Sequence, residues 1–358
     1  MVLFIKEDTK NFAKTPFIEV FLIKVPKWCK KFLKQYELIT HENISSLDGF
    51  YWSCKLEGKH SNREAYMEKK HNKARRKSKY YIICILLFIV FIIAIWGNTA
   101  LEVTQITISN NRIPSAFSGF RIAQVSDLHN AEFGENNEIL LQKLAESKPD
   151  IIVITGDLVD ASHTDLNAAI VFVEKATVIA PIYYVTGNHE ANITQYDDLK
   201  ERLEAVGVIV LEDEGVLLER EGKQLSLIGL SDPDFTIKGD LFGEVPAMVA
   251  TKLKGMEIQE TYTILLSHRP ELFETYVYCG IDLVLSGHAH GGQFRLPFVG
   301  GLIAPNQGFF PKYDAGVYKE GNTDMVVSRG IGNSIIPIRF NNRPEIVLVT
   351  LEANKKRN

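Results

Sequence analysis

The chain has 358 residues, of which 46% are hydrophobic and 23% charged, a balance that excludes a low-complexity or wholly disordered protein. The net charge is −4, but residues 1–79 carry +9 and residues 80–358 carry −13. The acidic body disfavours nucleic acid as the natural partner, because phosphate backbones are bound by clustered lysine and arginine. Residues 101–358 contain a single cysteine, Cys279, so no disulfide can form within that region.

Residues 1–79 form a basic segment that the sequence predicts to be cytoplasmic and weakly ordered. Part of it, Thr15–Ile39, mixes large apolar residues with five lysines and would also suit a basic amphipathic helix on the inner membrane surface. Pro26 interrupts that helical pattern, which favours the weakly ordered tail. A start at Met67 would give a shorter protein of a simple anchored type, with a basic stretch directly before an apolar helix.

Residues 80–100 are predicted to form one transmembrane helix. Tyr80–Trp96 carries no charge, and ~20 residues at ~1.5 Å per residue cross a ~30 Å hydrocarbon layer. A cleaved signal peptide is the alternative, but the sequence from Trp96 to Ala100 matches a cleavage site poorly, which favours an uncleaved anchor. By the positive-inside rule, the basic residues before the helix predict a single pass through the cell membrane with residues 101–358 outside the cytoplasm. These basic residues are Lys69, Lys70, Lys73, Arg75, Arg76, Lys77 and Lys79.

The rest of the chain alternates short apolar runs with helical stretches. The patterns predict helices at Leu140–Ser147 and Asn167–Ala176, and strands at Leu225–Leu230 and Glu345–Leu351. We therefore expect three further segments. They are a tether and domain entry at residues 101–119, a folded domain at residues 120–351 and a C-terminal tail at residues 352–358.

Five short apolar runs each end in a cluster of polar residues. Apolar runs of this length are typical of buried strands. In layered α/β folds, ligands gather at the carboxyl ends of strands, so we expect the five clusters to converge on one place. The runs and clusters are Arg121–Ser126 with Asp127-Leu128-His129, Ile151–Thr155 with Gly156-Asp157-Leu158-Val159-Asp160, Pro181–Thr186 with Gly187-Asn188-His189-Glu190, Tyr262–Ser267 with His268, and Ile281–Ser286 with Gly287-His288-Ala289-His290.

Seven side chains in these clusters are candidate metal ligands. The number exceeds the needs of one tetrahedral ion and suits two ions about 3.5–4 Å apart that share a carboxylate. All seven offer nitrogen or oxygen, which favours Mn, Fe, Zn or Co over an iron–sulfur cluster or structural zinc. Glycines at 156, 187 and 287 directly precede a ligand, where they permit a sharp turn. The candidates are Asp127, His129, Asp157, Asn188, His268, His288 and His290.

The order of these clusters resembles the calcineurin-like metallophosphoesterases over about residues 120–351. The resemblance implies an α/β fold, a four-layer α-β-β-α sandwich of two mixed sheets, here preceded by one transmembrane helix. It also implies a metal-dependent phosphodiesterase or phosphatase, in which two divalent ions, expected to be Mn, Zn or Fe, activate a hydroxide. The implied residue roles are a first metal held by Asp127, His129, Asp157 and His290, a second metal held by the bridging Asp157 with Asn188, His268 and His288, and a catalytic His189 oriented by Asp160.

Later residues resemble a membrane-associated bacterial branch of this family, the YkuE-type phosphoesterases. The likeness lies in Gly291–Pro297, Ser328–Ser334 and Arg343–Ile346. It implies a lipid-linked or cell-envelope phosphoester as substrate, for example a UDP-diacylglucosamine-like diphosphate, with the lipid bilayer as the second partner. Ala161 stands where the phosphoprotein phosphatases usually carry arginine, which disfavours a phosphoprotein substrate.

Two other functions remain as alternatives. One is a nuclease of the same superfamily, against which the acidic body and the membrane helix argue. The other is a catalytically silent, membrane-anchored binding protein, against which the complete set of candidate ligands argues. No feature of the sequence sets an oligomeric state.

Overall fold

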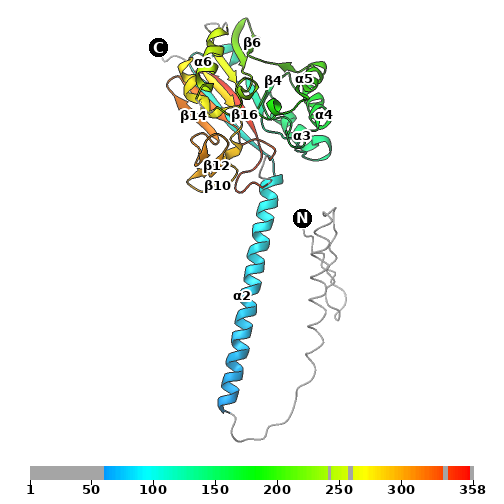
Figure 1. Ribbon diagram of the computed structural model, residues 1–358, viewed down its shortest axis with the longest axis vertical. Coiled ribbons are helices and arrows are strands. Elements are labelled where there is room, and N and C mark those ends of the chain that lie inside the picture. Colours follow the sequence, from blue (N-terminus) through cyan, green and yellow to red (C-terminus); the bar gives the residue numbers. More distant parts are fainter. Residues whose placement is uncertain (1–59, 241–242, 257–260, 334–337, 355–358) are drawn as a thin grey trace. The chain divides into compact units, whose positions relative to one another are not determined.

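The computed structural model describes residues 60–240, 243–256, 261–333 and 338–354 (Figure 1). These residues form one long helix and a layered α/β domain. The segment Thr15–Ile39, where we considered an amphipathic helix, lies outside the described residues.

The long helix, α2, spans His60–Thr99 and crosses the boundary between two compact units, Met1–Ser78 and Lys79–Asn358. It begins earlier than the predicted apolar segment and includes the basic residues that precede it. Within the second unit, its large apolar side chains are exposed, so no protein core covers them. The section Met67–Thr99 is long and apolar enough to cross a membrane, judged by length and composition.

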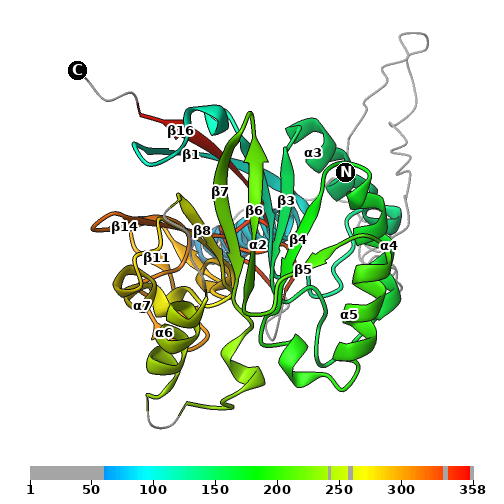
Figure 2. The ribbon, with the colours of Figure 1, turned by 90° about the horizontal axis from the view of Figure 1, so that it is seen from above.

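The first sheet has six strands in the order β1-β16-β2-β3-β4-β5. Strands β2 to β5 are parallel, whereas β16 runs antiparallel to β2 and parallel to β1. The strand bounds are β1 Glu102–Asn110, β2 Arg121–Val125, β3 Ile151–Thr155, β4 Ile182–Val185, β5 Ile209–Val210 and β16 Glu345–Ala353. Three helices cover one face of this sheet (Figure 2): α3 Glu138–Ser147, α4 Leu166–Thr177 and α5 Tyr196–Ala205.

The second sheet also has six strands, in the order β14-β15-β9-β8-β7-β6. Its central strands are parallel and its two edge strands antiparallel to their neighbours. The strand bounds are β6 Glu214–Arg220, β7 Lys223–Gly229, β8 Thr263–Leu266, β9 Leu283–Ser286, β14 Gly316–Glu320 and β15 Thr323–Val327. Two helices cover its outer face: α6 Val245–Gly255 and α7 Phe273–Tyr278.

The two sheets pack face to face. Apolar side chains from both sheets fill the space between them, such as Val153 and Val349 from the first and Ile264 and Leu285 from the second. Because the helices cover the outer faces, the central strands are buried on both sides, which explains their continuous apolar runs. The predicted four-layer α-β-β-α sandwich of two mixed sheets is therefore confirmed, with one candidate membrane helix before it.

Two small hairpins lie between β9 and β14 in the sequence. The first pairs β10 Arg295–Leu296 with β11 Gly300–Gly301, and the second pairs β12 Ile303–Ala304 with β13 Gly308–Phe309. Short 3₁₀ helices join other elements: η1 Ser115–Phe117, η2 Glu135–Asn137, η3 Glu190–Asn192, η4 Pro233–Phe235, η5 Pro270–Leu272 and η6 His290–Gly292.

The segment that we expected to be a tether contains a strand of the first sheet. Strand β1 pairs with β16 along nine residues, from Glu102 opposite Glu345 to Asn110 opposite Ala353. Only two residues, Ala100 and Leu101, separate the end of α2 from this strand. The helix is therefore followed almost directly by the folded domain.

Candidate metal centre

All five predicted apolar runs form strands of the two sheets. Strand β3 has the predicted bounds, and the other four strands are shorter than predicted by one or two residues. Strands β2, β3 and β4 are parallel neighbours in the first sheet, and β8 and β9 are parallel neighbours in the second. Parallel strands end at the same edge of a sheet. The polar clusters that follow them consequently meet, and donor atoms from both sheets approach one another closely.

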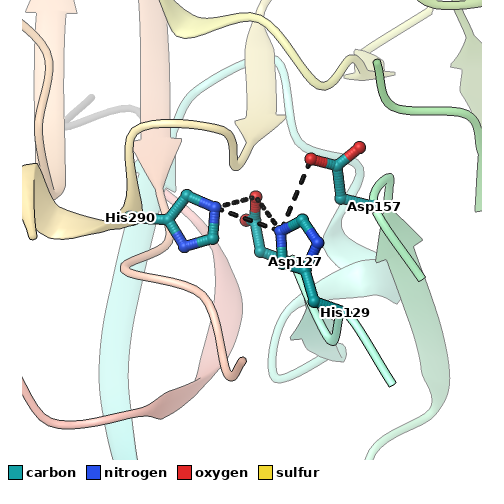
Figure 3. A group of neighbouring side chains, drawn as sticks. All are labelled: Asp127, His129, Asp157 and His290. Carbon is teal, nitrogen blue, oxygen red and sulfur yellow. Dashed lines mark hydrogen bonds and ion pairs between the residues drawn. The ribbon is translucent and has the colours of Figure 1, made fainter. Parts of the chain in front are cut away.

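The first group of donor atoms comes from Asp127, His129, Asp157 and His290 (Figure 3). One ligand atom from each of these buried residues lies within 4.8 Å of those of the others. The Nε2 atoms of His129 and His290 are 3.1 Å apart, and Nε2 of His290 is 3.3 Å from Oδ1 of Asp127. Oδ2 of Asp157 is 3.6 Å from Nε2 of His129.

The second group comes from Asp157, His268 and His288, with Asn188 beside them. Nε2 of His268 is 3.2 Å from Oδ2 of Asp157, 3.1 Å from Nδ1 of His288 and 3.2 Å from Oδ1 of Asn188. The other ring nitrogen of His268 donates to the carbonyl of Thr155 at 2.8 Å, which turns Nε2 toward the cluster. The same oxygen of Asp157 thus faces both groups, while its Oδ1 accepts from the backbone N–H of His189 at 2.8 Å.

This donor set fits bound cations. Around His268, ring nitrogens, an amide oxygen and a carboxylate oxygen face one another, and they carry too few protons to pair among themselves. A cation between them would accept the lone pairs that face it, and nitrogen and oxygen donors suit a divalent transition metal. The buried cluster on this fold therefore supports a site for two divalent metal ions.

The protonation of the histidines also suits metal binding. Burial lowers the pKa of His129 to about 4 and that of His290 to about 3, so both rings are neutral at pH 7, as ligands must be. For His268, burial acts in the same direction, but the adjacent Asp157 carboxylate outweighs it and raises the pKa to about 10. Metal binding displaces protons from its ligands, so a bound cation would take the place of that proton.

A third group, His129, Asp160 and His189, lies beside the first. Oδ2 of Asp160 is 3.7 Å from Nδ1 of His129 and 3.9 Å from Nδ1 of His189. The backbone N–H of Ala161 donates to Nδ1 of His189 at 2.9 Å. The resemblance implied that Asp160 orients His189, and the amide of Ala161 donates to the same nitrogen that Asp160 approaches. The neutral His189 ring therefore carries its proton on Nε2.

Comparison with known proteins agrees with this geometry. Residues 120–292 match the calcineurin-like phosphoesterase family. The chain is 33% identical to the metallophosphoesterase YkuE of Bacillus subtilis over 258 residues, which cover 71% of this chain and 86% of YkuE. It is 30% identical to the phosphodiesterase YaeI of Escherichia coli over 241 residues, 65% of this chain and 82% of YaeI. A Danio rerio protein named as a transmembrane protein with a metallophosphoesterase domain is 27% identical over 289 residues, 75% of this chain and 62% of that protein.

The chain belongs to the calcineurin-like metallophosphoesterase family. The expected resemblance to this family is confirmed, and the protein is a hydrolase of phosphoric ester bonds. His163, which follows none of the five apolar runs directly, has a side chain that is 91% exposed and lies outside the two donor groups around Asp157.

The backbone of this metallophosphoesterase is unusual at the site. Asp127, His129, Asp157, His288 and His290 all have positive φ, between 46° and 65°, the left-handed region that favours glycine. Such conformations persist where the surrounding structure enforces them, and they cluster at functional sites.

We expected the glycines before the ligands to permit sharp turns, and for two of them this needs a correction. Gly187 and Gly287 do not have positive φ, and they are required instead because a side chain there would collide with neighbouring atoms. A Cβ on Gly187 would lie 2.2 Å from Oδ1 of Asp157.

Glu190 holds the loops after β3 and β4 together. Its fully buried carboxylate accepts from the backbone N–H groups of Gly187 at 2.7 Å, Asp157 at 2.9 Å and Val159 at 3.2 Å. Burial raises its pKa to about 7. The sequence placed Glu190 in a cluster but assigned it no role. Its position directly after two candidate site residues was the signal that could have shown its importance.

Two buried arginines lie beside candidate ligand histidines, one next to His288 and one next to His290, and neither arginine was predicted to have a role. Arg269 forms a two-point ion pair with Asp232 at 2.6 and 2.8 Å, and its Nη1 lies 3.3 Å from Nε2 of His288. Arg339 is fully buried, and its Nη2 lies 3.4 Å from Nδ1 of His290. Arg269 follows His268 directly, which was a usable signal, whereas nothing in the sequence near Arg339 marks it as buried.

Proposed function

We propose that this metallophosphoesterase is held in the cell membrane by α2, with its catalytic domain outside the cytoplasm, and hydrolyses a lipid-linked or cell-envelope phosphoester. The observation that carries the catalytic part is the convergence of two donor groups on one oxygen of Asp157. The membrane part rests on the exposed apolar surface of α2 and on the basic residues before it.

The proposed ligands follow the two donor groups. Asp157 would hold both ions, the first together with Asp127, His129 and His290, and the second together with Asn188, His268 and His288. Mn, Zn or Fe would suit these nitrogen and oxygen donors. When bound, two such ions lower the pKa of a water molecule and offset the charge of the phosphoryl group.

The residues of the chain supply the remaining chemistry. His189 is partly exposed and lies at the border of the cluster, with its Nε2 4.0 Å from Oδ2 of Asp157. Because the amide of Ala161 donates to Nδ1, a neutral His189 ring carries its proton on Nε2, and from there it would donate to the leaving oxygen of the substrate. Asp160, whose Oδ2 lies 3.7 Å from Nδ1 of His129 and 3.9 Å from Nδ1 of His189, would place negative charge beside both rings.

Metal removal and reloading test the proposal. We expect the purified full chain to lose activity on a soluble phosphodiester after chelation and to regain it with Mn²⁺, with about two ions bound per chain. Asp157→Ala should abolish both activity and high-affinity binding of the ions, because its carboxylate is the one shared by both groups. His163→Ala, a nearby exposed histidine, is the matched control and should change neither. A stoichiometry of one that Asp157→Ala leaves unchanged would contradict the two-ion site.

A further inference from the structure

Six large apolar residues near the metal centre are exposed, and we call them the apolar rim. They are Phe298, Val299, Phe309, Phe310, Ile338 and Phe340, with exposed fractions from 41% to full exposure. Phe298 lies at the tip of the β10–β11 hairpin, and Phe309 and Phe310 end the β12–β13 hairpin. Over residues 294–311, which contain both hairpins, Arg295 is the only charged residue.

The rim differs from an ordinary protein surface. Single exposed apolar residues are common, but grouped large apolar side chains on a nearly uncharged segment mark a surface that contacts something else. Phe298 and Phe310 also have positive φ, 67° and 55°, a conformation that bulky residues rarely adopt. The hairpin turns therefore fix the backbone conformation that holds these two side chains outward.

Hydrogen bonds connect the rim to the last turn of α2. The side chain of Asn98 accepts from the backbone N–H of Arg339 at 2.8 Å and donates to its carbonyl at 3.0 Å. Ile338 and Phe340 of the rim flank Arg339, and the carbonyl of Phe340 accepts from Arg295 at 3.0 Å, where the first hairpin begins. The rim is thus connected to the last turn of α2 through Asn98, which lies two residues after Trp96.

Trp96 marks the level at which the apolar part of α2 ends. It is the last residue of the uncharged apolar run, and the guanidinium of Arg343 lies 4.6 Å from the centre of its ring. Tryptophan and arginine together suit the boundary between hydrocarbon and headgroups. Residues hydrogen-bonded to Asn98 lie within one helical turn of that level, since α-helices rise ~1.5 Å per residue.

The same hairpins also reach the metal centre. Asn306, in the turn of the β12–β13 hairpin, lies with its Nδ2 3.4 Å from Nε2 of His288. The backbone N–H of Leu302, directly after β11, donates at 3.1 Å to the carbonyl of Gly292, two residues after His290. Each hairpin therefore has one end at the candidate ligands and another in the exposed rim.

We propose that the apolar rim inserts into the outer layer of the bilayer beside α2, so that lipid is its partner. The proposal rests on the proposed function, in which α2 spans the membrane. Continuity with the helix end selects lipid over another protein, because any surface at the level of Trp96 lies against the bilayer. A phosphate at headgroup level would then lie next to the metal centre, which would make a membrane-embedded phosphoester the accessible substrate class.

Tryptophan fluorescence in vesicles tests this insertion. The full chain is reconstituted in phosphatidylethanolamine–phosphatidylglycerol vesicles, with and without brominated acyl chains, which quench only tryptophan within the hydrocarbon layer. Phe298→Trp and Phe310→Trp each add one reporter to the rim, and the emission of the unchanged chain is subtracted. We expect the added emission to be shifted to the blue and strongly quenched by the brominated lipid.

The control is Val178→Trp, on an exposed position after α4, whose added emission should be red and unquenched. If the full chain floats with the vesicles but the two rim reporters behave like this control, the rim does not insert, and the membrane anchor stands. If the chain does not float with the vesicles, both the anchor and the rim proposal are overturned. Activity on a soluble phosphodiester confirms that each variant is folded.

Discussion

At the scale of single residues, the catalytic centre depends on hydrogen bonds that fix the tautomers of its histidines. The carbonyl of Thr155 fixes His268, and the amide of Ala161 fixes His189. In the neutral rings the two bonds have opposite effects: the first puts the proton of His268 on Nδ1 and leaves Nε2 as the acceptor, and the second puts the proton of His189 on Nε2. These tautomers suit the roles that we propose, a metal ligand for His268 and a general acid for His189.

His189→Ala should retain the metal ions and lose rate. The residue contributes no atom to the two groups around Asp157, and removing a general acid costs roughly 10²–10⁴ in rate. The loss should shrink for substrates with acidic leaving groups, which leave without a proton. Rates for a series of phosphodiesters, together with elemental analysis, provide the measurement. Loss of metal from this variant would show that His189 is a ligand.

Gly187→Ala should disrupt the site although alanine adds only one methyl group. Its Cβ would meet Asp157 at 2.2 Å from Oδ1, so the shared carboxylate must move. We expect loss of metal affinity and activity. Gly255→Ala is the matched control, because nothing lies within 4 Å of its Cβ, and it should leave both unchanged. Equal metal content in the two variants would contradict the proposed role of Asp157.

The sequence was sufficient to propose the seven ligands but not the residues that support them. Ligands stand out because histidine, aspartate and asparagine follow apolar runs at a strand end. Arg269 and Arg339 do not stand out, since arginine is usually exposed and their partners are distant in the sequence or are backbone carbonyls. The roles of Ala161 and Thr155 are invisible for the same reason, because a backbone group can act from any residue type.

At the scale of elements, the strands that carry ligands were predictable because they are buried on both faces. Their apolar runs are continuous, as in β3, where all five residues are buried. Strand β1 was missed because its edge position leaves most of its residues partly exposed, with Thr104, Gln105 and Thr107 among them. Its place is determined by pairing with β16, more than two hundred residues later, which no local pattern reveals.

The buried ion pair between Arg269 and Asp232 joins the loop after β7 to the loop after β8. Asp232→Asn should lower the free energy of unfolding by about 1.5–3 kcal/mol, because the buried guanidinium of Arg269 loses its two-point carboxylate partner and keeps Asp234 at 3.0 Å. It should also weaken metal binding on the His288 side. Glu274→Gln, in the exposed pair with Lys312, is the control and should change little. Thermal unfolding of the metal-free full chain compares the stability of the two variants. Equal stability would contradict the structural role of Arg269.

At the scale of the whole molecule, the proposed topology places the two ends of α2 in different compartments. Protease added to intact, wall-stripped cells should digest the catalytic domain and spare an epitope placed before residue 79. The reason is the excess of basic residues before the apolar run, against none between Gly97 and Asn111. Protection of the domain with digestion of the epitope would reverse the topology and remove the argument for an envelope substrate.

The double hydrogen bond between Asn98 and the backbone of Arg339 has a consequence for how such an enzyme would find its substrate. With the helix end fastened to the loop beside His290, the centre cannot swing away from the surface on a flexible stalk. Encounters would then occur by lateral diffusion in two dimensions. Turnover would follow the mole fraction of substrate within the leaflet rather than its amount per volume, so diluting a vesicle suspension would leave the rate per enzyme unchanged, whereas adding inert lipid to each vesicle would reduce it.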